Sequence, residues 1–257
     1  MDALIGYTGF VGSILASQHR FTDLYNSKNS AESAGKSYDL FFCAAAPGKK
    51  WLANQHPAED RAAIDSICRT LEKITIHRFV LISTVDVYDT LSGVDEDHGI
   101  ESSTLQPYGK HRLLLEEYVR ERYERHHIIR LPALFGPGLR KNFIFDLLNN
   151  RMLDYTHPDS MFQFYNMNRI WQDIQTVLSQ NIPLITMATE PLRAGDIAKT
   201  VAHLELKPGN GVKPVQYNLK SKYAQLFGGK NGYLYGKDQI LKEIQTFIKT
   251  EPKTKLE

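Results

Sequence analysis

Short apolar runs alternate along the first half of the chain with longer stretches that have a helical hydrophobic period. The apolar runs have the length and composition of buried strands, and between them the apolar positions recur every three to four residues. Strands are expected at residues 3–5, 22–25, 38–46, 78–84 and 127–132, and helices at 13–16, 57–74 and 108–125. Strands that alternate with helices predict an α/β fold with a doubly wound parallel sheet, covered on both faces.

The alternation weakens beyond residue 136. Helices are expected at residues 142–148, 167–178, 194–204 and 237–249, and strands at 184–187 and 216–219, with a short strand-like pattern at 162–166. We therefore predict one domain over residues 1–135 and a small lobe over residues 136–257 that mainly binds substrate. The strand and helix near residues 184–204 are expected to return to the first domain. Such a lobe would cover the carboxyl ends of the strands, where ligands bind in sheets of this kind.

Three glycines lie in the turn between the first strand and the first helix. Gly6 allows the tight turn, Gly9 lets the backbone approach a pyrophosphate, and Gly12 lets the helix pack closely on the strand. Phosphates then bind the N–H groups of the helix N-terminus. The turn predicts a dinucleotide site, and a tight turn that binds nothing is the alternative. The expected cofactor contacts here are Gly6, Thr8, Gly9, Phe10, Val11 and Gly12.

The end of the second strand bears on the choice of dinucleotide. Proteins that prefer NAD usually carry a carboxylate there, bonded to the ribose 2′-hydroxyl, and no carboxylate occurs at residues 26–29. The amide, hydroxyl and ammonium groups of Asn26, Ser27 and Lys28 suit a 2′-phosphate, so we favour NADP over NAD. Two alternatives stay open: this segment is a polar loop, or Asp23 is the ribose ligand in a shifted strand register.

Composition and charge exclude several classes of protein. Of 257 residues, 42% are hydrophobic and 23% charged, which is ordinary for a globular protein, and a net charge of +2 gives no reason to expect nucleic acid or a membrane surface as a partner. Two cysteines allow at most one disulfide and suit a reducing compartment. With no signal-peptide pattern and no apolar run of spanning length, we expect a cytoplasmic location. The histidines form no ligand set, so no metal is predicted.

Five motifs now support a resemblance. They are Gly6-x-x-Gly9-x-x-Gly12, Ala44-Ala45-Ala46, Ser83-Thr84-Val85-Asp86-Val87-Tyr88, Tyr108-Gly109-Lys110-His111-Arg112 and Arg130-Leu131-Pro132-Ala133-Leu134-Phe135-Gly136-Pro137-Gly138. Their order and rough spacing over the first 140 residues resemble the extended short-chain dehydrogenase/reductase family of nucleotide-sugar epimerases, dehydratases and reductases. The resemblance implies a Rossmann-like sheet, an NAD(P) cofactor, a nucleotide-sugar substrate and a homodimer. Further cofactor contacts by motif position are Ala44, Ala45, Ala46, Leu131, Pro132 and Leu134.

The resemblance also assigns a catalytic group. In that family a Ser or Thr, a Tyr and a Lys act together, with the tyrosine exchanging a proton with the sugar oxygen during hydride transfer. By motif position Thr84 is the hydroxyl residue and Tyr108 the acid and base. Arg112 stands where the family has its lysine, four residues after the tyrosine and on the same helix face. It keeps the positive charge but is planar and never deprotonated, so it cannot take part in a lysine proton relay.

That one replacement separates two hypotheses. The first is an NAD(P)-dependent reductase, epimerase or dehydratase in which Thr84, Tyr108 and Arg112 work together. The second is a dinucleotide-binding relative that has lost full chemistry and acts as a sensor or scaffold. We favour the enzyme. Dehydration is its least favoured branch, because dehydratases of the family usually have an acidic pair after the hydroxyl residue, and here Val85 and Asp86 follow.

Three residues are candidates for the substrate side. Lys49 lies in a basic loop, residues 48–51, whose ammonium groups suit a diphosphate, although a solvated loop is equally compatible with the sequence. Asp86 either contacts substrate or caps and braces its own loop. Asn142 follows the Gly-Pro-Gly turn and could contact phosphate or sugar.

Overall fold

The computed structural model describes residues 1–252, and the chain divides into two compact units. The first unit comprises Met1–Asp89, His98–Leu131 and Ile170–Ile185. The second comprises Thr90–Asp97, Pro132–Arg169 and the chain from Thr186 onward. The strand expected at residue 184 thus lies largely in the first unit, whereas the helix expected at residue 194 lies in the second.

The first unit is built on a six-stranded sheet in the order β11-β7-β6-β4-β1-β2. Its strands are β1 (Asp2–Ile5), β2 (Asp23–Tyr25), β4 (Leu40–Cys43), β6 (Phe79–Thr84), β7 (His126–Leu131) and β11 (Leu184–Thr186). The pairs from β2 across to β7 are all parallel, which confirms the predicted Rossmann-like α/β fold. The chain passes from β1 to β2 on one side and then to β4 on the other, so the strand order reverses at the carboxyl ends of β1 and β4.

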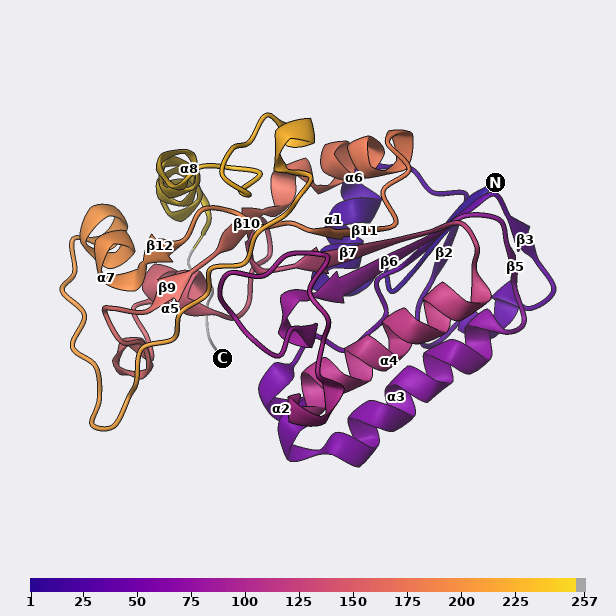
Figure 1. Ribbon diagram of the computed structural model, residues 1–257, viewed down its shortest axis with the longest axis horizontal. Coiled ribbons are helices and arrows are strands. Elements are labelled where there is room, and N and C mark those ends of the chain that lie inside the picture. The colour runs from indigo at the N-terminus through magenta and orange to yellow at the C-terminus, as the bar shows by residue number, and fades with distance from the viewer. Residues whose placement is uncertain (253–257) are drawn as a thin grey trace. The chain divides into compact units, whose positions relative to one another are not determined.

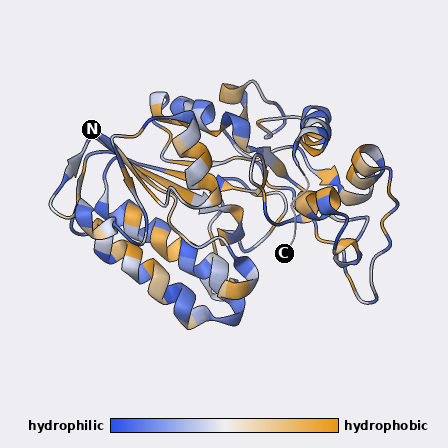
Figure 2. Cartoon of the chain, turned by 180° about the vertical axis from the view of Figure 1, so that it is seen from behind, coloured by the Kyte–Doolittle hydropathy of each residue, from blue (hydrophilic) through white to orange (hydrophobic). Residues whose placement is uncertain are grey.

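Helices cover both faces of this sheet (Figure 1). They are α1 (Phe10–Gln18), α2 (Lys50–Gln55), α3 (Pro57–Leu71), α4 (Pro107–Arg122) and α6 (Ile170–Ser179). The neighbouring helices α3 and α4 lie on one face, while α1 and α6 lie on the other. Alternate strand residues point to opposite faces, which is why Phe41 packs toward α3 and α4 whereas Phe42 contacts Trp171 of α6. Figure 2 shows the resulting apolar strands between helices with polar outer surfaces.

A buried carboxylate fastens α4 to the sheet. Glu116 is fully buried and accepts hydrogen bonds from Ser83 of β6 at 2.5 Å and from Arg130 of β7 at 3.1 and 2.7 Å. Arg120, one turn further along α4, donates to the same carboxylate at 2.7 Å. Two arginines and a hydroxyl offset the desolvation of this charge, and together they fix α4 against the ends of β6 and β7.

Several elements of the first unit are shorter than expected. The run at residues 38–46 is broken at Asp39, because the backbone N–H groups of residues 39 and 40 both donate to the Met1 carbonyl. It therefore forms β3 (Ser37–Tyr38), which pairs with β5 (Thr75–Ile76), and the separate strand β4. The helix expected to reach residue 74 ends at Leu71, which frees the chain to form β5.

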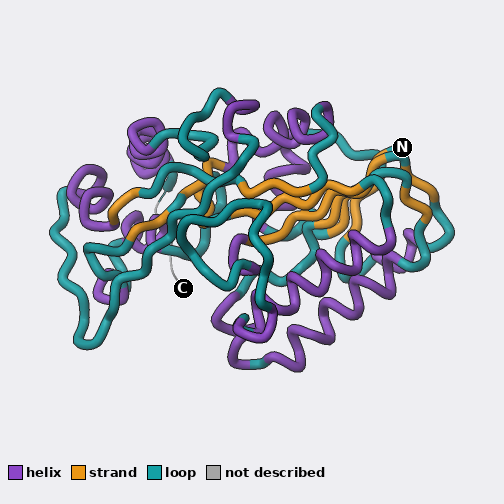
Figure 3. Tube along the Cα trace, viewed as in Figure 1, coloured by secondary structure: helices purple, strands orange, loops and turns teal. Residues whose placement is uncertain are grey.

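The second unit contains short elements joined by long loops (Figure 3). They are β8 (Ala133–Phe135), α5 (Phe143–Asn149), β9 (Met161–Phe162), β10 (Phe164–Asn166), β12 (Leu192–Arg193), α7 (Ala194–Ile197), which continues as a π-helix over Ala198–Ala202, and α8 (Lys237–Thr250). The segment expected to be one strand at 162–166 is divided by Gln163, whose buried amide bonds the Thr189 and Leu219 backbones. The strand expected at 216–219 is present only as two isolated bridges.

Short 3-10 helices complete the described chain, at Ser30–Ser33, Val85–Val87 (η2), Ser102–Thr104, Leu153–Tyr155, Met167–Arg169 and Ala224–Phe227. Within residues 1–252, no helix combines the length and apolar character needed to span a membrane.

Candidate active site

The glycine turn joins β1 to α1, and two of its glycines are required by packing. Gly6 has φ +95°, and a Cβ there would lie 2.5 Å from the carbonyl carbon of Ala44. A Cβ on Gly12 would lie 2.1 Å from the Gly6 carbonyl oxygen. Gly9 differs, because its Cβ would meet that oxygen at an ordinary 3.4 Å. Packing therefore does not require glycine at position 9, and the absence of a side chain there leaves the backbone of the turn accessible.

The N-terminus of α1 is open to an anion. Gly9 is the N-cap residue, and within residues 1–252 no side chain caps the helix at that position or adds an acidic group to its first turn. Thr8 and Gly9 are exposed, and Phe10 and Val11 are half-buried. The first N–H groups of the helix therefore face a surface on which a negative group is favoured. The turn and the uncapped helix fit the pyrophosphate of a dinucleotide.

The strand register places Asn26 at the end of β2. Ile5 pairs with Tyr25, so the next residue on each strand is Gly6 and Asn26. The Asn26 side chain donates to the Tyr7 hydroxyl at 3.1 Å and accepts from the Lys28 backbone N–H at 2.8 Å. Ser27 and Lys28 are exposed. The polar groups expected near the ribose thus do border the glycine turn.

Asp23 is committed to other partners. It lies two residues before the end of β2, and it accepts hydrogen bonds from the Tyr38 hydroxyl, the Lys36 ammonium at 3.0 Å and the Tyr25 hydroxyl at 3.0 Å. These bonds, that from Tyr38 most of all, lower the pKa of Asp23. The alternative register, in which Asp23 would be the ribose carboxylate, does not occur.

The loop after β4 links the glycine turn to α4. Ala44, the first residue after β4, is packed against Gly6, and residues 44–46 are half-buried. The Pro47 carbonyl then accepts a hydrogen bond from Arg112 of α4. A short chain of contacts therefore joins the turn expected to hold phosphates to the helix that carries Tyr108.

Tyr108 lies in the first turn of α4, where Pro107 begins the helix. Its backbone N–H donates to Asn54 at 3.0 Å, and the residue is 9% exposed. Burial raises the pKa of Tyr108, which the Arg112 charge and the Thr84 hydroxyl at the end of β6 oppose. That Thr84 and Tyr108 act together in catalysis stays a prediction.

Gly109 lets α4 approach the loop that follows Thr84. A Cβ at this position would lie 2.0 Å from the backbone oxygen of Asp86, in η2. The glycine after the tyrosine is therefore needed for the close packing that brings Tyr108 to Thr84.

Arg112 is buried and its hydrogen bonds are largely used within the protein. Its side chain is 3% exposed, and its terminal nitrogens donate to both Asp60 oxygens, to the Pro47 carbonyl and to the Tyr108 carbonyl. Its guanidinium carbon lies 4.0 Å from the centre of the Tyr108 ring. Its Nε is the one buried donor on this side chain that finds no acceptor within residues 1–252.

Asp60, at the start of α3, is the partner that holds this arginine. Burial opposes ionisation of Asp60, but hydrogen bonds from Arg112 and from His111 at 2.8 Å prevail and lower its pKa. Asp60 was not among the predicted site residues, since an acidic residue in the first turn of a helix is common on exposed surfaces. The signal that could have found it is the unusual Arg112, which as a buried charge needs a carboxylate.

Lys50 and Asp86 form an ion pair beside this group. The Lys50 ammonium lies 2.6 Å from one Asp86 oxygen, and the other Asp86 oxygen is 3.4 Å from the Thr84 hydroxyl. Lys49, the expected substrate contact, is exposed and is the N-cap residue of α2. The structure is compatible with both interpretations of Asp86. Its backbone N–H donates to Thr84, which suits a role in bracing the loop, and its carboxylate is partly exposed, which suits a contact with substrate.

The other predicted residues lie at or beyond the end of β7. Leu131 pairs with Thr84 in the sheet register, and both Leu131 and Pro132 are buried. Leu134 and Asn142 belong to the second unit. The Asn142 oxygen caps α5 by accepting from Ile144 at 3.0 Å, and its nitrogen donates to the Leu134 carbonyl at 2.7 Å. Its polar atoms therefore already have partners within the second unit.

The sequence itself decides the family. A model of the NAD-dependent epimerase/dehydratase family matches residues 21–157, more than half of the chain. The chain belongs to this family. The match includes Thr84, Tyr108 and Arg112 and begins after the glycine turn. No protein with a curated description matches the chain.

Solved structures share the epimerase/dehydratase fold over nearly the whole chain. MoeE5 in complex with UDP-glucose and NAD is 17% identical with a TM-score of 0.72, over 96% of this chain and 97% of that one. RMD from Pseudomonas aeruginosa complexed with NADPH is 15% identical with a TM-score of 0.71, over 97% and 99%. UDP-N-acetylglucosamine 4-epimerase from Methanobrevibacter ruminantium M1 is 14% identical with a TM-score of 0.69, over 96% of each chain. At these identities the likeness establishes the fold.

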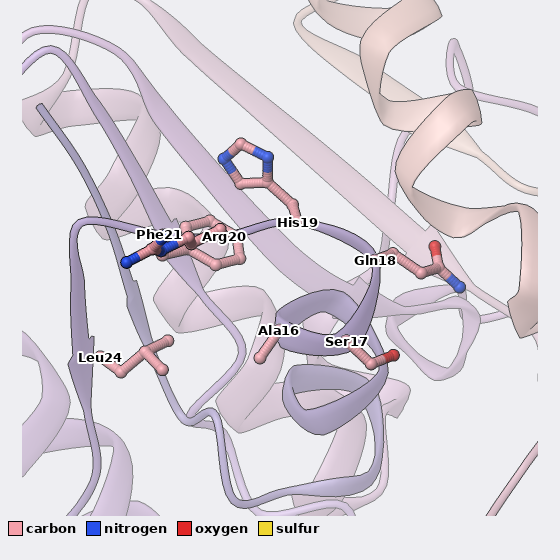
Figure 4. A pocket seen from close by; sticks show the side chains of 7 residues that line it. All are labelled: Ala16, Ser17, Gln18, His19, Arg20, Phe21 and Leu24. Atoms are coloured by element: carbon pink, nitrogen blue, oxygen red, sulfur yellow. The ribbon is translucent and has the colours of Figure 1, made fainter.

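A pocket of the first unit lies away from this site. It has a volume of about 250 Å³ and is formed by the end of α1 and the segment that leads to β2 (Figure 4). There His19 stacks on Trp171 at 3.9 Å and bonds Asp2 at 2.6 Å. The glycine turn begins α1, whereas this pocket adjoins its last turn, about 12 Å further along the helix. No group of three or more potential metal ligands occurs within residues 1–252.

Proposed function

We propose that the protein is an NAD(P)-dependent enzyme that acts on a nucleotide-linked sugar by hydride transfer, with Tyr108 as the general acid and base. The observation that carries the proposal is the close packing of the first turn of α4, which carries Tyr108, on the loop that follows Thr84: a Cβ on Gly109 would lie 2.0 Å from the Asp86 backbone oxygen. The sheet that holds Thr84 also has three glycines in its first turn. Related folds named as complexes with UDP-glucose and NAD, or with NADPH, support the same substrate and cofactor classes.

Each residue has one role in this proposal. A bound nicotinamide would accept or return the hydride, and the glycine turn together with residues 44–46 would hold its dinucleotide. The Tyr108 oxygen takes the proton from a sugar hydroxyl as its carbon is oxidised, and returns that proton on reduction. The Thr84 hydroxyl holds the same sugar oxygen, and the Arg112 charge favours the phenolate against burial.

NADP is the proposed form of the cofactor. With Asp23 bonded to Tyr38 and Lys36, no carboxylate occurs at the end of β2 to bind a 2′-hydroxyl. The exposed Ser27 and Lys28 offer a hydroxyl and an ammonium to a 2′-phosphate. Calorimetric titration should then give a lower dissociation constant for NADPH than for NADH, and Lys28→Glu should reverse that order.

The geometry of Arg112 favours a second candidate, a dinucleotide-binding relative without full turnover. Its terminal nitrogens are engaged by Asp60 and Pro47, so a guanidinium held in this way offers few donors to a ribose. Such a protein would bind the dinucleotide and exchange no hydride. Whether turnover occurs separates the two candidates.

The deciding experiment measures binding and turnover separately. Purified protein is titrated with the four nicotinamide dinucleotides by calorimetry, and hydride exchange is followed by mass spectrometry with deuterated nucleotide sugars. Gly9→Ala should lower dinucleotide affinity while the fold persists, because its Cβ meets only ordinary contacts. Gly99→Ala, which has open space around it, is the matched control. Tyr108→Phe should lower turnover by about 10²-fold or more and leave affinity unchanged.

Two results would refute the proposal. Failure of all four dinucleotides to bind would remove both candidates, and binding without exchange across UDP-, dTDP- and GDP-linked sugars would favour the second. The homodimer and the cytoplasmic location belong to the same proposal. Light scattering on the purified protein tests the former, and fractionation of the source cells tests the latter.

A further inference from the structure

An ion pair that the proposed chemistry does not use lies next to the reacting hydroxyls. The Lys50 ammonium, at the start of α2, is 2.6 Å from one oxygen of Asp86, and the second Asp86 oxygen is 3.4 Å from the Thr84 hydroxyl. The helix turn that carries Tyr108 packs on the Asp86 backbone at Gly109, and the Thr84 hydroxyl is among the groups that lower the pKa of Tyr108. Contacts therefore run from Lys50 through Asp86 to Thr84, beside the turn that carries the phenol.

Asp86 is held in place on its backbone side. Its N–H donates to the Thr84 hydroxyl at 3.2 Å, and α4 packs against its carbonyl at Gly109, where there is no room for a Cβ. The Asp86 side chain is 19% exposed, whereas that of Lys50 is 47% exposed. The carboxylate is thus held beside Thr84, and Lys50 is the more exposed partner of the pair.

The Thr84 hydroxyl has a single proton to donate. It can be given either to the Asp86 carboxylate or to the Tyr108 oxygen, and only the second bond favours a phenolate. An ammonium on the far oxygen of Asp86 draws negative charge away from the oxygen that faces Thr84. It also offsets the repulsion between this carboxylate and an ionised Tyr108.

The other charges near Tyr108 are already balanced. Arg112 faces the ring from α4, but its charge is paired with Asp60 of α3, which His111 also contacts. The charges that act on Tyr108 are those of Arg112, Asp86 and Lys50. Among these, the Asp86 charge opposes the phenolate, and Lys50 is the cation bonded to it.

We propose that Lys50 is a positioning residue of this site: its ammonium holds and neutralises the Asp86 carboxylate, so that Thr84 donates its proton to Tyr108. Lys50 acts through Asp86 and Thr84 and does not itself touch the reacting atoms. The inference rests on the proposed function for its meaning in catalysis, but the contacts that carry it exist in the protein without ligand.

The test measures ionisation at position 108 directly. Tyr108 is replaced in the full-length chain by 3,5-difluorotyrosine, which ionises at lower pH than tyrosine, and its pKa is followed by fluorine NMR. Lys50→Met should raise this pKa by about 0.5 to 1 unit, an effect at the low end for a charge pair because Lys50 is half exposed. Asp86→Asn should lower it. Lys50→Arg should restore the original value, and Lys49→Met is the matched control for loss of a neighbouring exposed charge.

The double variant decides how Lys50 acts. If Lys50 works mainly through Asp86, adding Lys50→Met to Asp86→Asn should raise the pKa at position 108 by less than Lys50→Met does alone, the remainder being the direct effect of the Lys50 charge. The proposal is overturned if Lys50→Met has no more effect than Lys49→Met, or if its effect is the same with and without Asp86. Should Lys50→Met not fold, a pKa that does not fall in Asp86→Asn overturns the proposal by itself.

The outcome is separable from that of the proposed function. These titrations use the protein without cofactor or substrate. If the pKa shifts occur but no hydride is exchanged, the role of Lys50 is supported and the proposed enzymatic function is refuted. In an active protein, Lys50→Met should move the limb of the kcat/KM pH profile that reports Tyr108 by the same amount and in the same direction as the NMR titration.

Discussion

Replacing Arg112 by lysine keeps the positive charge on α4 but cannot reproduce its hydrogen bonds. The guanidinium donates to both oxygens of Asp60 and to the carbonyls of Pro47 and Tyr108. A lysine side chain ends in a single nitrogen, which cannot reach all of these acceptors at once. We expect Arg112→Lys to retain one bond to Asp60 and to lose the second, together with the bond to Pro47.

The cost follows from burial. Asp60 is 6% exposed, so water cannot readily replace the hydrogen-bond donor that one of its oxygens would lose. One lost hydrogen bond to a charged group costs about 1.5 to 3 kcal/mol, and the one to the Pro47 carbonyl, which is only partly buried, about 1 kcal/mol. Their sum predicts that Arg112→Lys lowers the free energy of unfolding by about 2.5 to 4 kcal/mol. At about 2 to 4 °C per kcal/mol for a protein of this size, the midpoint of thermal unfolding should fall by roughly 5 to 16 °C.

The assay is urea unfolding followed by circular dichroism, with thermal unfolding as a second measurement. Arg122→Lys is the matched control, because Arg122 lies at the exposed end of the same helix, where it bonds the Glu72 carbonyl at 3.1 Å and contacts the Tyr123 ring. Its effect should stay below about 0.5 kcal/mol.

A result in which Arg112→Lys is no less stable than Arg122→Lys would refute this account of Arg112. Turnover gives a separate result. If Arg112 serves mainly to hold Asp60 and the Pro47 loop, the lysine variant should lose stability whichever way its rate of hydride exchange changes. A higher rate would indicate an impaired enzyme, and a lower rate an enzyme adapted to arginine.

Three further predictions concern packing and charge. Gly12→Ala should destabilise the fold and abolish dinucleotide binding, unlike Gly9→Ala, because its Cβ would lie 2.1 Å from a backbone oxygen; calorimetry and circular dichroism check both effects. Glu116→Gln should lower the free energy of unfolding by about 3 to 5 kcal/mol in urea, since it leaves the buried Arg130 without its charge partner. The stability difference between the native protein and Asp60→Asn should be largest at neutral pH and shrink as the pH falls below 3.8, because the folded pKa of Asp60 is lowered from that value and protonation removes its stabilising effect.

Each of these can fail in a specific way. A Gly12→Ala protein that binds dinucleotide as well as Gly9→Ala does would mean that the turn adapts without loss. An effect of Glu116→Gln below about 1 kcal/mol would show that the buried Arg130 does not depend on this negative charge. If the difference in free energy of unfolding between the native protein and Asp60→Asn stays constant from pH 7 to pH 3, then folding does not lower the pKa of Asp60.

The parts of the site that depend on neighbours in sequence could be predicted. The glycine turn and the helix start at Pro107 follow from short motifs whose steric and hydrogen-bonding needs are local. The choice between Asp23 and Asn26 as the residue at the end of β2 could not be made from the sequence, because the apolar pattern of a three-residue strand does not define where the strand ends.

Strand, turn and helix signals that act over a few residues predicted the parallel sheet and the glycine turn, and the five motifs indicated the family. Only the tertiary structure decided what surrounds Tyr108. Asp60 and Arg112 are 52 residues apart in sequence, and Lys50 and Asp86 are 36 apart. The sequence around a charged residue does not identify a partner that is distant in the chain. The packing of α2, α3 and η2 against α4 brings these pairs together, and a buried charge is stable only when such a partner is present.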